Sequence, residues 1–291
     1  MKKWEITTED EDYPQELLLL NHPPEVLYGM GDRSILRMPC LSIIGARKAT
    51  PYGMAIAEMS GRCAADNNIV VVSGGALGCD YMAGMAALNA GGKTIVVAGC
   101  GADVTYPTTS NELFEAARGG QGAVISLDKW NTPPRRYAFP RRNAVIAALG
   151  KVLLVTEAGL CSGTMSTAEF ANSLGKTIYA IPGSIFSPTS AGTNRLISEG
   201  AQIIPDETSL SIAISLDFDC LVLEHMKHDK KLTPLLSALI ASPSRPEELA
   251  WRLSENLLTV LNSLTEYEAR GMVKRLPDGR YTPSKDFYLD S

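Results

Sequence analysis

The chain has 291 residues, of which 45% are hydrophobic, and its formal net charge is −5. This is enough apolar material for one large core with a small additional domain, and the acidic balance means that any nucleic-acid contact must come from a local basic patch. Because the sequence has no apolar run of about 20 residues and residues 1–14 lack the apolar stretch of a secretory signal, we expect a cytoplasmic protein without a membrane span.

Residues 40–210 alternate short, β-branched apolar runs with segments of helical periodicity. This alternation predicts βαβ units and an α/β fold with a doubly wound, mostly parallel sheet. We expect strands at Leu41–Ile44, Ile69–Val72, Thr94–Ala98, Ala123–Ile125, Val152–Thr156, Thr177–Ile181 and Gln202–Ile204. We expect helices at Tyr52–Asn67, Cys79–Ala90, Asn111–Ala117, Arg142–Leu149, Thr164–Leu174 and Asn194–Glu199.

Glycines gather directly after the predicted strands. In an open α/β sheet, ligands bind outside the carboxyl ends of the strands, where glycine lets the backbone approach closely. Loops there that lead into a helix suit an anion, because the first N–H groups of a helix have no partner within it. The residues that we expect in these anion-binding loops are Gly45, Ser73, Gly74, Ser162, Gly163 and Thr164.

A basic stretch stands out in residues 128–151, which hold six lysines and arginines against one aspartate. Its centre, Arg135–Asn143, reads RRYAFPRRN and lies between two predicted strands, so we expect a loop at one end of the sheet. Guanidinium groups bind phosphates, and a nearby aromatic ring can stack on a base. The alternative interpretation is a solvated loop whose arginines only favour solubility.

Beyond residue 210 glycine becomes rare and leucine common. Helices expected at Leu232–Ala241, Glu247–Leu253 and Asn256–Arg270, followed by two β runs around a Pro-Asp-Gly turn, predict a winged-helix domain over residues 217–291. The exposed face of the third helix is not basic, which leaves a protein partner at least as well supported as DNA. Residues 1–39 are then an N-terminal segment that packs on the core.

Metal, nucleotide-cofactor and nucleophilic chemistry find little support. The six cysteines form no C-x-x-C pair, so we expect buried reduced thiols, and no cysteine or carboxylate joins His225 and His228 at the spacing of a zinc site. Two Gly-Lys-Thr triplets lack the first glycine of a P-loop and precede strands, so we expect no cofactor. The carboxylates that could serve as general bases or cap helices are Asp80, Asp103, Glu157 and Glu169.

Eight short motifs occur in an order that resembles the DNA-processing protein A (DprA/Smf) family. They include Tyr13-Pro14, Ile44–Arg47, Ser73–Asp80, Gly99–Asp103, Phe139–Asn143, Glu157-Ala158 with Ser162–Thr164, Ile181–Gly183 and Gly192 with Asn194. Each motif alone is weak, but eight in the right order are specific. The chain differs from the family pattern at Gly84, Leu127 and Ala144.

The resemblance implies an extended Rossmann-like fold with a C-terminal winged helix that binds single-stranded DNA without a cofactor or catalysis. It also implies protection of incoming DNA and loading of the RecA recombinase during natural transformation or recombination, usually by a homodimer. The DNA-binding residues that it implies are Arg47, Phe139, Arg141, Arg142, Asn143 and Lys176.

An alternative from another class is a protein that binds or cleaves nucleotide derivatives on a related Rossmann-like fold, similar to the cytokinin-activating phosphoribohydrolases. Such an enzyme needs a carboxylate beside a sugar, for which Glu157 or Glu169 would be the candidate. The Pro-Gly-Gly-x-Gly-Thr-x-x-Glu motif of that enzyme family is absent, because the corresponding region reads EAGLCSGTMSTAE.

Overall fold

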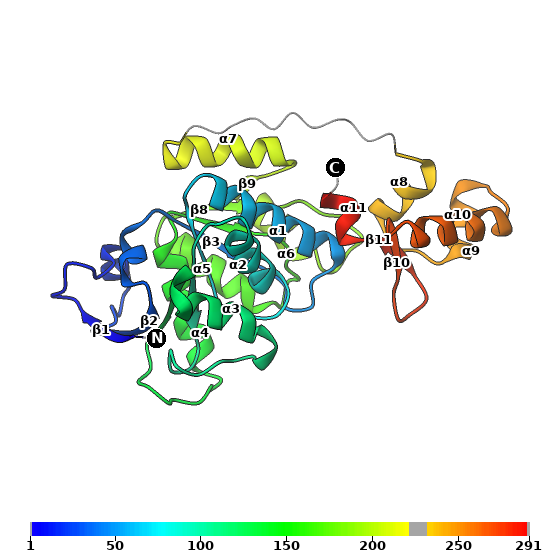
Figure 1. Cartoon of the computed structure of the whole chain (residues 1–291). Coiled ribbons are helices and arrows are strands. Elements are labelled where there is room, and N and C mark those ends of the chain that lie inside the picture. Colours follow the sequence, from blue (N-terminus) through cyan, green and yellow to red (C-terminus); the bar gives the residue numbers. More distant parts are fainter. Residues whose placement is uncertain (1, 221–231, 290–291) are drawn as a thin grey trace.

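The computed structural model describes residues 2–220 and 232–289, and it is built around a nine-stranded sheet (Figure 1). The strand order is β1-β2-β6-β5-β4-β3-β7-β8-β9. Neighbouring strands from β6 to β9 in this order pair in parallel, as predicted, so the α/β doubly wound fold is confirmed. These strands are β3 (Cys40–Ile44), β4 (Val70–Ser73), β5 (Thr94–Ala98), β6 (Gly122–Ser126), β7 (Val152–Val155), β8 (Thr177–Ala180) and β9 (Gln202–Ile203).

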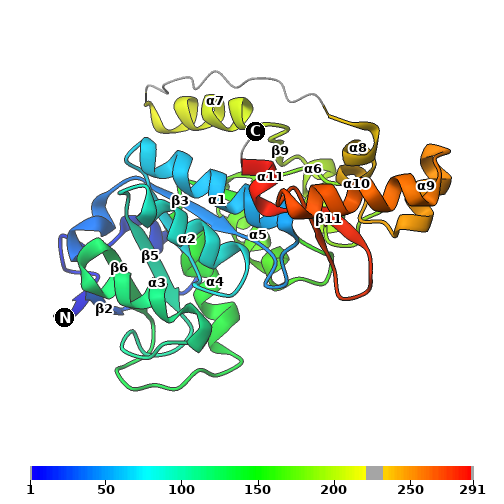
Figure 2. The ribbon, with the colours of Figure 1, turned by 45° about the vertical axis from the view of Figure 1, so that its right-hand side comes forward.

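Helices cover both faces of the sheet (Figure 2). They are α1 (Pro51–Asp66), α2 (Cys79–Asn89), α3 (Asn111–Ala116), α4 (Ala138–Leu149), α5 (Gly163–Ser173), α6 (Ala191–Ser198) and α7 (Glu207–Phe218). Side chains of α4, α5 and α6 pack on one face and those of α1, α2 and α7 on the other. Alternate residues of a strand point to opposite faces, so Ile95 and Val97 join the first layer while Val96 and Ala98 pack with α3.

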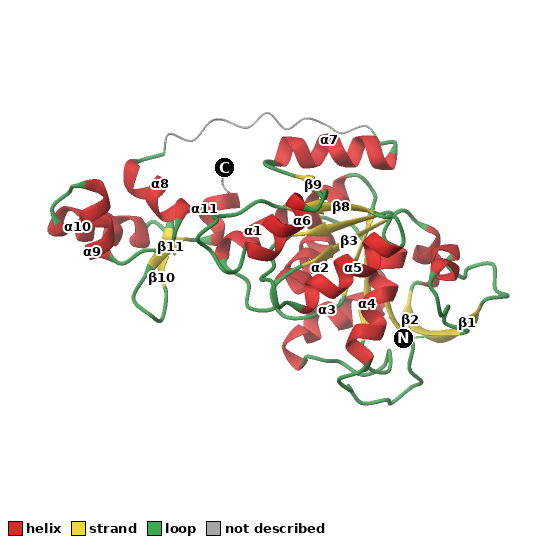
Figure 3. Ribbon diagram, turned by 180° about the vertical axis from the view of Figure 1, so that it is seen from behind, coloured by secondary structure: helices red, strands yellow, loops and turns green. Residues whose placement is uncertain are grey.

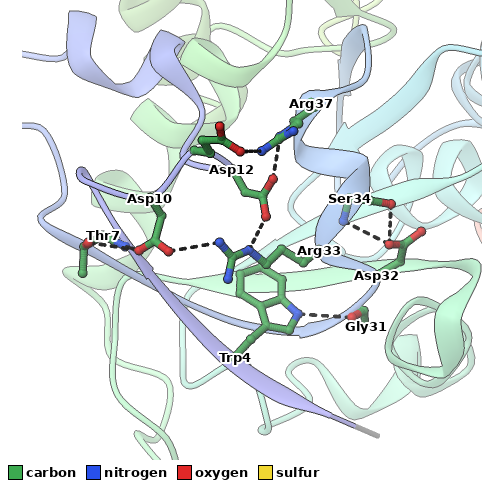
Figure 4. A network of polar contacts seen from close by, with 10 residues as sticks. Trp4, Thr7, Asp10, Asp12, Gly31, Asp32, Arg33, Ser34 and Arg37 are labelled. Carbon is green, nitrogen blue, oxygen red and sulfur yellow. Dashed lines mark hydrogen bonds and ion pairs between the residues drawn. The ribbon is translucent and has the colours of Figure 1, made fainter.

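The N-terminal segment extends the sheet by two antiparallel strands that we did not predict, β1 (Lys3–Thr7) and β2 (Val26–Gly31). Between β1 and β3 lie two short 3₁₀ helices, η1 (Gln15–Leu19) and η2 (Arg33–Arg37). Arg33 forms ion pairs with Asp10 at 3.1 Å and with Asp12 at 2.6 Å, and Arg37 reaches Asp12 at 2.5 Å (Figure 4). Asp10 and Asp12 are therefore paired with arginines of their own segment.

The C-terminal elements follow one another in the predicted order, and they lie at the end of the molecule opposite β1 and β2 (Figure 3). They are α8 (Pro234–Ala241), α9 (Pro246–Leu253), α10 (Leu257–Ala269), β10 (Val273–Arg275), β11 (Tyr281–Pro283) and α11 (Lys285–Leu289). Their leucines form a separate apolar cluster, as a winged helix requires. His225 and His228 lie outside the described residues.

The connection between β5 and β6 is irregular. Between β5 and β6 lie a short 3₁₀ helix, η3 (Thr108–Ser110), and a π-helical turn, η4 (Ala117–Gln121). Four of the six cysteines are buried, as expected, whereas Cys161 is exposed and Cys220 is half-buried. Among the described helices, none has the length and apolar character needed to cross a bilayer.

Candidate functional site

Successive strands are added toward one edge of the sheet from β3 to β6 and toward the other edge from β7 to β9. The point where this strand order reverses lies between β3 and β7, which pair in parallel although a long stretch of chain separates them. Such a reversal leaves a crevice beyond the carboxyl ends of the two strands, because the loops after them lead to opposite faces. A cavity of ≈390 Å³ lies there, which we call the edge cavity. Seven of the predicted residues line it: Gly45, Arg47, Arg142, Asn143, Ser162, Gly163 and Thr164.

A smaller hollow of ≈150 Å³, which we call the aromatic pocket, adjoins the edge cavity and shares Arg47, Ala76 and Arg142 with it. Its other walls include the rings of Tyr106 and Phe139. The two rings lie 5.7 Å apart at 46°, and the guanidinium of Arg47 lies 5.7 Å from the centre of the Phe139 ring. A cation beside an accessible ring suits a flat heterocycle that carries a phosphate.

Arg142 is the charged residue at the junction of the two hollows, and only 5% of it is exposed. Burial lowers the pKa of this guanidinium, and the nearby Asp80 carboxylate raises it again. An arginine is charged at neutral pH in any case, because its free pKa exceeds 12. Its Nε and Nη1 atoms have no hydrogen-bond partner among the described residues. A cation that lines a cavity and has unsatisfied N–H groups is a candidate contact for an anion.

Asp80 holds the loops around this cation. One carboxylate oxygen accepts a hydrogen bond from the backbone N–H of Gly45 at 3.3 Å, and the other accepts from Gly74 at 3.0 Å. Burial raises the pKa of Asp80, and the charge of Arg142 and the two N–H donors oppose that rise. The carboxylate therefore ties the loop after β3 to the loop after β4 and offsets part of the buried positive charge.

The N-terminus of α5 forms the opposite wall of the edge cavity. Ser162 caps the helix by accepting from the backbone N–H of Thr164 at 3.2 Å. The Thr164 hydroxyl donates to the carbonyl oxygen of Gly45 at 3.0 Å, which fixes the helix end against the loop after β3. Asn143 of α4 donates to the Ser166 hydroxyl at 3.2 Å. The partial positive charge of this helix end faces the same cavity as Arg142.

The prediction that all of Arg135–Asn143 is a loop is wrong, because α4 begins at Ala138, four residues before the predicted start. Pro140 is accommodated there because the N–H groups of a first helical turn have no partner within the helix. The helix places Phe139 and Arg142, three residues apart, on one face toward the pockets. Arg141 lies outside the lining of either hollow and pairs with Asp128 at 2.7 Å.

Lys176 also lies away from the two hollows. It comes directly before β8, whereas the hollows lie beyond the carboxyl ends of the parallel strands. Burial lowers the pKa of Lys176, and the nearby Glu16 and Cys40, at the amino end of β3, raise it. Lys176, which the resemblance implies as a DNA-binding residue, therefore lies at the opposite end of the strands from Arg47.

Other predicted residues serve the loops themselves. Ser73 is fully buried, and its hydroxyl accepts from the backbone N–H of Gly75 at 3.4 Å. Gly74 lies against Arg142, where a Cβ atom would come within 1.4 Å of Nη1. The three positions that differ from the family pattern, Gly84, Leu127 and Ala144, line neither hollow. Sequence reasoning missed Tyr106 and Ala76, although both lie within or beside quoted motifs.

The remaining carboxylates are engaged or lie elsewhere. Glu157 accepts from the backbone N–H and from the hydroxyl of Thr50, both at 2.8 Å, so it holds the start of α1. Asp103 pairs with Lys3 at 2.6 Å. Glu169 is exposed on α5 and does not line the edge cavity. Within the described chain, the two hollows thus contain cations, glycines and hydroxyls, with Asp80 as their one carboxylate.

Comparison with known proteins extends over most of the chain. The family model for DNA recombination-mediator protein A matches residues 4–215. The DNA processing protein DprA of Streptococcus pneumoniae is 37% identical over 195 residues, which are 67% of this chain and 68% of that protein. Protein Smf of Escherichia coli is 31% identical over 283 residues, 94% of this chain and 76% of that protein.

Solved structures give the same result. The structure of DNA processing protein A from Streptococcus pneumoniae superposes with a TM-score of 0.68 and 35% identity, covering 72% of this chain and 74% of that chain. A structure of DNA processing protein A from Helicobacter pylori, which concerns its single-stranded DNA binding mode, superposes with a TM-score of 0.67 and 32% identity. That match covers 73% of this chain and 96% of the other.

Proposed function

Because the chain belongs to the DNA recombination-mediator protein A family, we propose that it binds single-stranded DNA in the edge cavity and the aromatic pocket, without catalysis. The observation that carries the proposal is the buried guanidinium of Arg142, whose Nε and Nη1 atoms have no partner among the described residues. Unsatisfied N–H groups cost about 1–3 kcal/mol each in a protein interior, so a shift of the guanidinium toward a phosphate in the hollows that it lines would be favourable.

The aromatic pocket would take a base of the same strand. Phe139 is half-buried, so its ring is fixed while one part remains accessible, and Arg47 approaches it from the solvent side. Stacking of a base on such a ring contributes roughly 1–3 kcal/mol and depends little on sequence. The N-terminus of α5 would bind a second phosphate through its backbone N–H groups. Phosphate and base subsites of this kind suit a strand whose bases are unpaired.

The wider role follows from the family. We propose that the protein protects incoming single strands and loads a RecA-type recombinase onto them, as a cytoplasmic homodimer, in natural transformation or general recombination. The support is the family description and curated relatives from six bacterial genera. The domain bounds that we propose are 1–39, 40–210 and 217–291.

The site can be tested by fluorescence anisotropy with labelled oligo-dT at several salt concentrations. We expect Phe139→Ala to weaken binding about tenfold, because one stacking contact is lost. We expect Arg47→Ala to weaken binding and to reduce the salt dependence by about 0.7 in the slope of log K against log salt, as for one lost phosphate contact.

Arg141→Ala is the matched control, because this exposed arginine belongs to the same basic stretch but pairs with Asp128. It should change binding less than Arg47→Ala does. Equal losses for the two variants would mean that only general positive charge matters and that the pocket is not the site. Salt-insensitive binding by the unaltered protein, or release of a base from a nucleoside monophosphate, would overturn the proposed function itself.

A further inference from the structure

A third and larger cavity, of ≈680 Å³, lies between the carboxyl edge of the sheet and the C-terminal helices. We call it the interface cavity. Its walls come from Thr50 and Tyr52, from the loop between β8 and α6, from the end of α8 and from Arg252 of α9. None of the DNA-binding residues expected from the sequence lines it. A cavity of this size is in the range of small-molecule and nucleotide sites.

The interface cavity continues directly from the edge cavity. Thr189 lines both cavities. The neighbouring strands β3, β7 and β8 each contribute to both cavities through the loop that follows them, and the loop after β8 contributes Pro188 to the edge cavity and Ser187 to the interface cavity. After β3 the loop contributes Lys48 to one and Thr50 to the other, and after β7 it contributes Gly159 and Glu157. A linear polymer that leaves the edge cavity along the strand ends therefore enters the interface cavity.

The loop between β8 and α6 presents two large apolar side chains to this cavity. Ile185 and Phe186 are each 84% exposed, which is unfavourable in water unless another surface covers them. The loop is held firmly at its start, since the backbone of Gly183 donates to the Asn194 side chain at 3.1 Å and accepts from it at 3.0 Å. A ring displayed on a fixed loop loses little conformational entropy when it binds.

The charges around the cavity also fit a nucleotide. Arg252 is exposed on α9 and supplies a cation. Glu157 is the carboxylate among the lining residues, but only 2% of it is exposed and both its oxygens accept from Thr50. Hydroxyl groups of Ser184, Ser187 and Ser242 add donors and acceptors for the edges of a base.

We propose that the interface cavity is a second nucleotide subsite on the same single strand, with Phe186 as its stacking surface and Arg252 as its phosphate contact. The inference rests on the proposed function, since the strand must first occupy the edge cavity. It gives the C-terminal helices a part in DNA binding that does not use the recognition helix of a winged helix, whose exposed face is not basic. The occupant is the continuation of the strand, with a base over Phe186.

The test measures affinity for oligo-dT from about 4 to about 20 nucleotides, the range over which such sites fill. Unaltered protein should gain affinity once the strand is long enough to reach the second subsite. Phe186→Ala should bind short strands normally and lose about tenfold in affinity for long ones, and Arg252→Ala should act in the same direction. Trp251→Ala is the control, because this 85% exposed aromatic residue of α9 does not line the cavity.

If the Phe186→Ala variant binds oligo-dT of every length as tightly as the unaltered protein does, the inference is overturned while the proposed function stands. Absence of binding at every length by the unaltered protein overturns both. A second measurement does not depend on a variant: a long strand with 5-iodouracil at each position in turn should cross-link to Phe186 and to Phe139 from different positions. Cross-links to Phe139 alone, at all positions, would also overturn the second subsite.

Discussion

Arg142 joins the ligand site to the hydrophobic core. Its guanidinium packs against Gly74 and lies near Asp80, and its Nε and Nη1 atoms are buried without a partner among the described residues. The residue lines both hollows at the edge of the sheet. An isolated buried charge would be strongly destabilising, so the nearby Asp80 carboxylate supports the fold by offsetting this charge. Arg142 thus contributes to the stability of the fold and to the proposed ligand contact, so a substitution that displaces its guanidinium should lower both stability and binding.

Gly74→Ala tests this coupling. A Cβ atom at residue 74 would come within 1.4 Å of the Arg142 Nη1 atom, so the guanidinium must move. We expect a loss of about 1–3 kcal/mol in the free energy of unfolding, measured by urea titration, together with weaker oligo-dT binding. Gly119→Ala is the control, because no atom lies within 4 Å of its Cβ position. Unchanged stability in Gly74→Ala would contradict the packing of Arg142 described here.

At the scale of single elements, three hydrogen bonds that involve Thr50 hold the start of α1. Thr50 caps the helix by accepting from the backbone N–H of Gly53 at 3.1 Å, and Pro51 occupies its first position. Glu157, from the loop after β7, then accepts twice from Thr50. The carboxylate therefore fixes the loop after β3, which carries Arg47, against the loop after β7.

Glu157→Gln should separate this structural role from a catalytic one. The amide has only one accepting oxygen, so one donor of Thr50 loses its partner, and we expect the free energy of unfolding to fall by about 1–2 kcal/mol. Glu169→Gln, on the exposed face of α5, should change it by less than about 0.5 kcal/mol. Urea titration measures both. If Glu157→Gln instead left stability intact and abolished release of a base from a nucleoside monophosphate, the enzyme alternative would be supported.

The regular elements could be predicted from the sequence to within a few residues, because buried parallel strands are continuous apolar runs with glycine after them. The strands β1 and β2 were not predicted, since β1 mixes polar and apolar residues over only five positions and β2 is a short apolar run interrupted by glycine. β2 joins the sheet by pairing with the distant β6, and β1 by pairing with β2. α7 was missed because apolar residues occur all around it, and Leu216 remains 74% exposed. Such a sequence lacks the spacing of apolar residues from which an amphipathic helix is predicted.

The site was predictable in part. Glycine and hydroxyl loops could be placed at one edge by topology alone, which brought Arg47 and Arg142 together correctly. Which arginine of Arg141 and Arg142 faces inward could not be predicted, because that depends on the extra helical turn that starts at Ala138. The resemblance implies Lys176 as a binding residue, but this residue comes directly before β8 and so lies at the amino end of that strand, away from the hollows. The role of Asp80 beside a buried cation could not be predicted, because Asp80 and Arg142 lie far apart in the sequence and approach each other only in the folded chain.

At the scale of the whole molecule, α11 attaches the C-terminal helices to the core. Figure 1 shows α11 beside α1. Lys285 pairs with Glu58 of α1 at 2.5 Å, and the rings of Tyr288 and Tyr52 meet edge to face with centres 5.5 Å apart. The ion pair is mostly covered, with 30% of the lysine and 21% of the glutamate side chain exposed. This attachment forms one side of the interface cavity, since Tyr288 lines it.

Charge reversal at this attachment gives a clear expectation. Lys285→Glu places two carboxylates together, so hydrogen exchange of the α11 backbone should become several-fold faster, in keeping with about 1 kcal/mol for such a pair. Adding Glu58→Lys should restore the slow exchange, because the pair is then re-formed with its partners exchanged. Arg270→Glu, which breaks an exposed pair with Glu266 on α10, should leave α11 unaffected. No recovery in the double variant would show that the tyrosines alone hold α11.

The burial of Arg142 beneath Gly74 also shapes how this protein can diverge. Inherited changes at residue 142 meet selection for folding before they meet selection for a ligand, because the side chain is part of the packed interior. Lineages can therefore tune affinity at exposed positions such as Arg47, where a substitution leaves the interior unchanged. A substitution at residue 142 therefore carries a folding cost that a substitution at the exposed Arg47 does not, whichever ligand the hollows take.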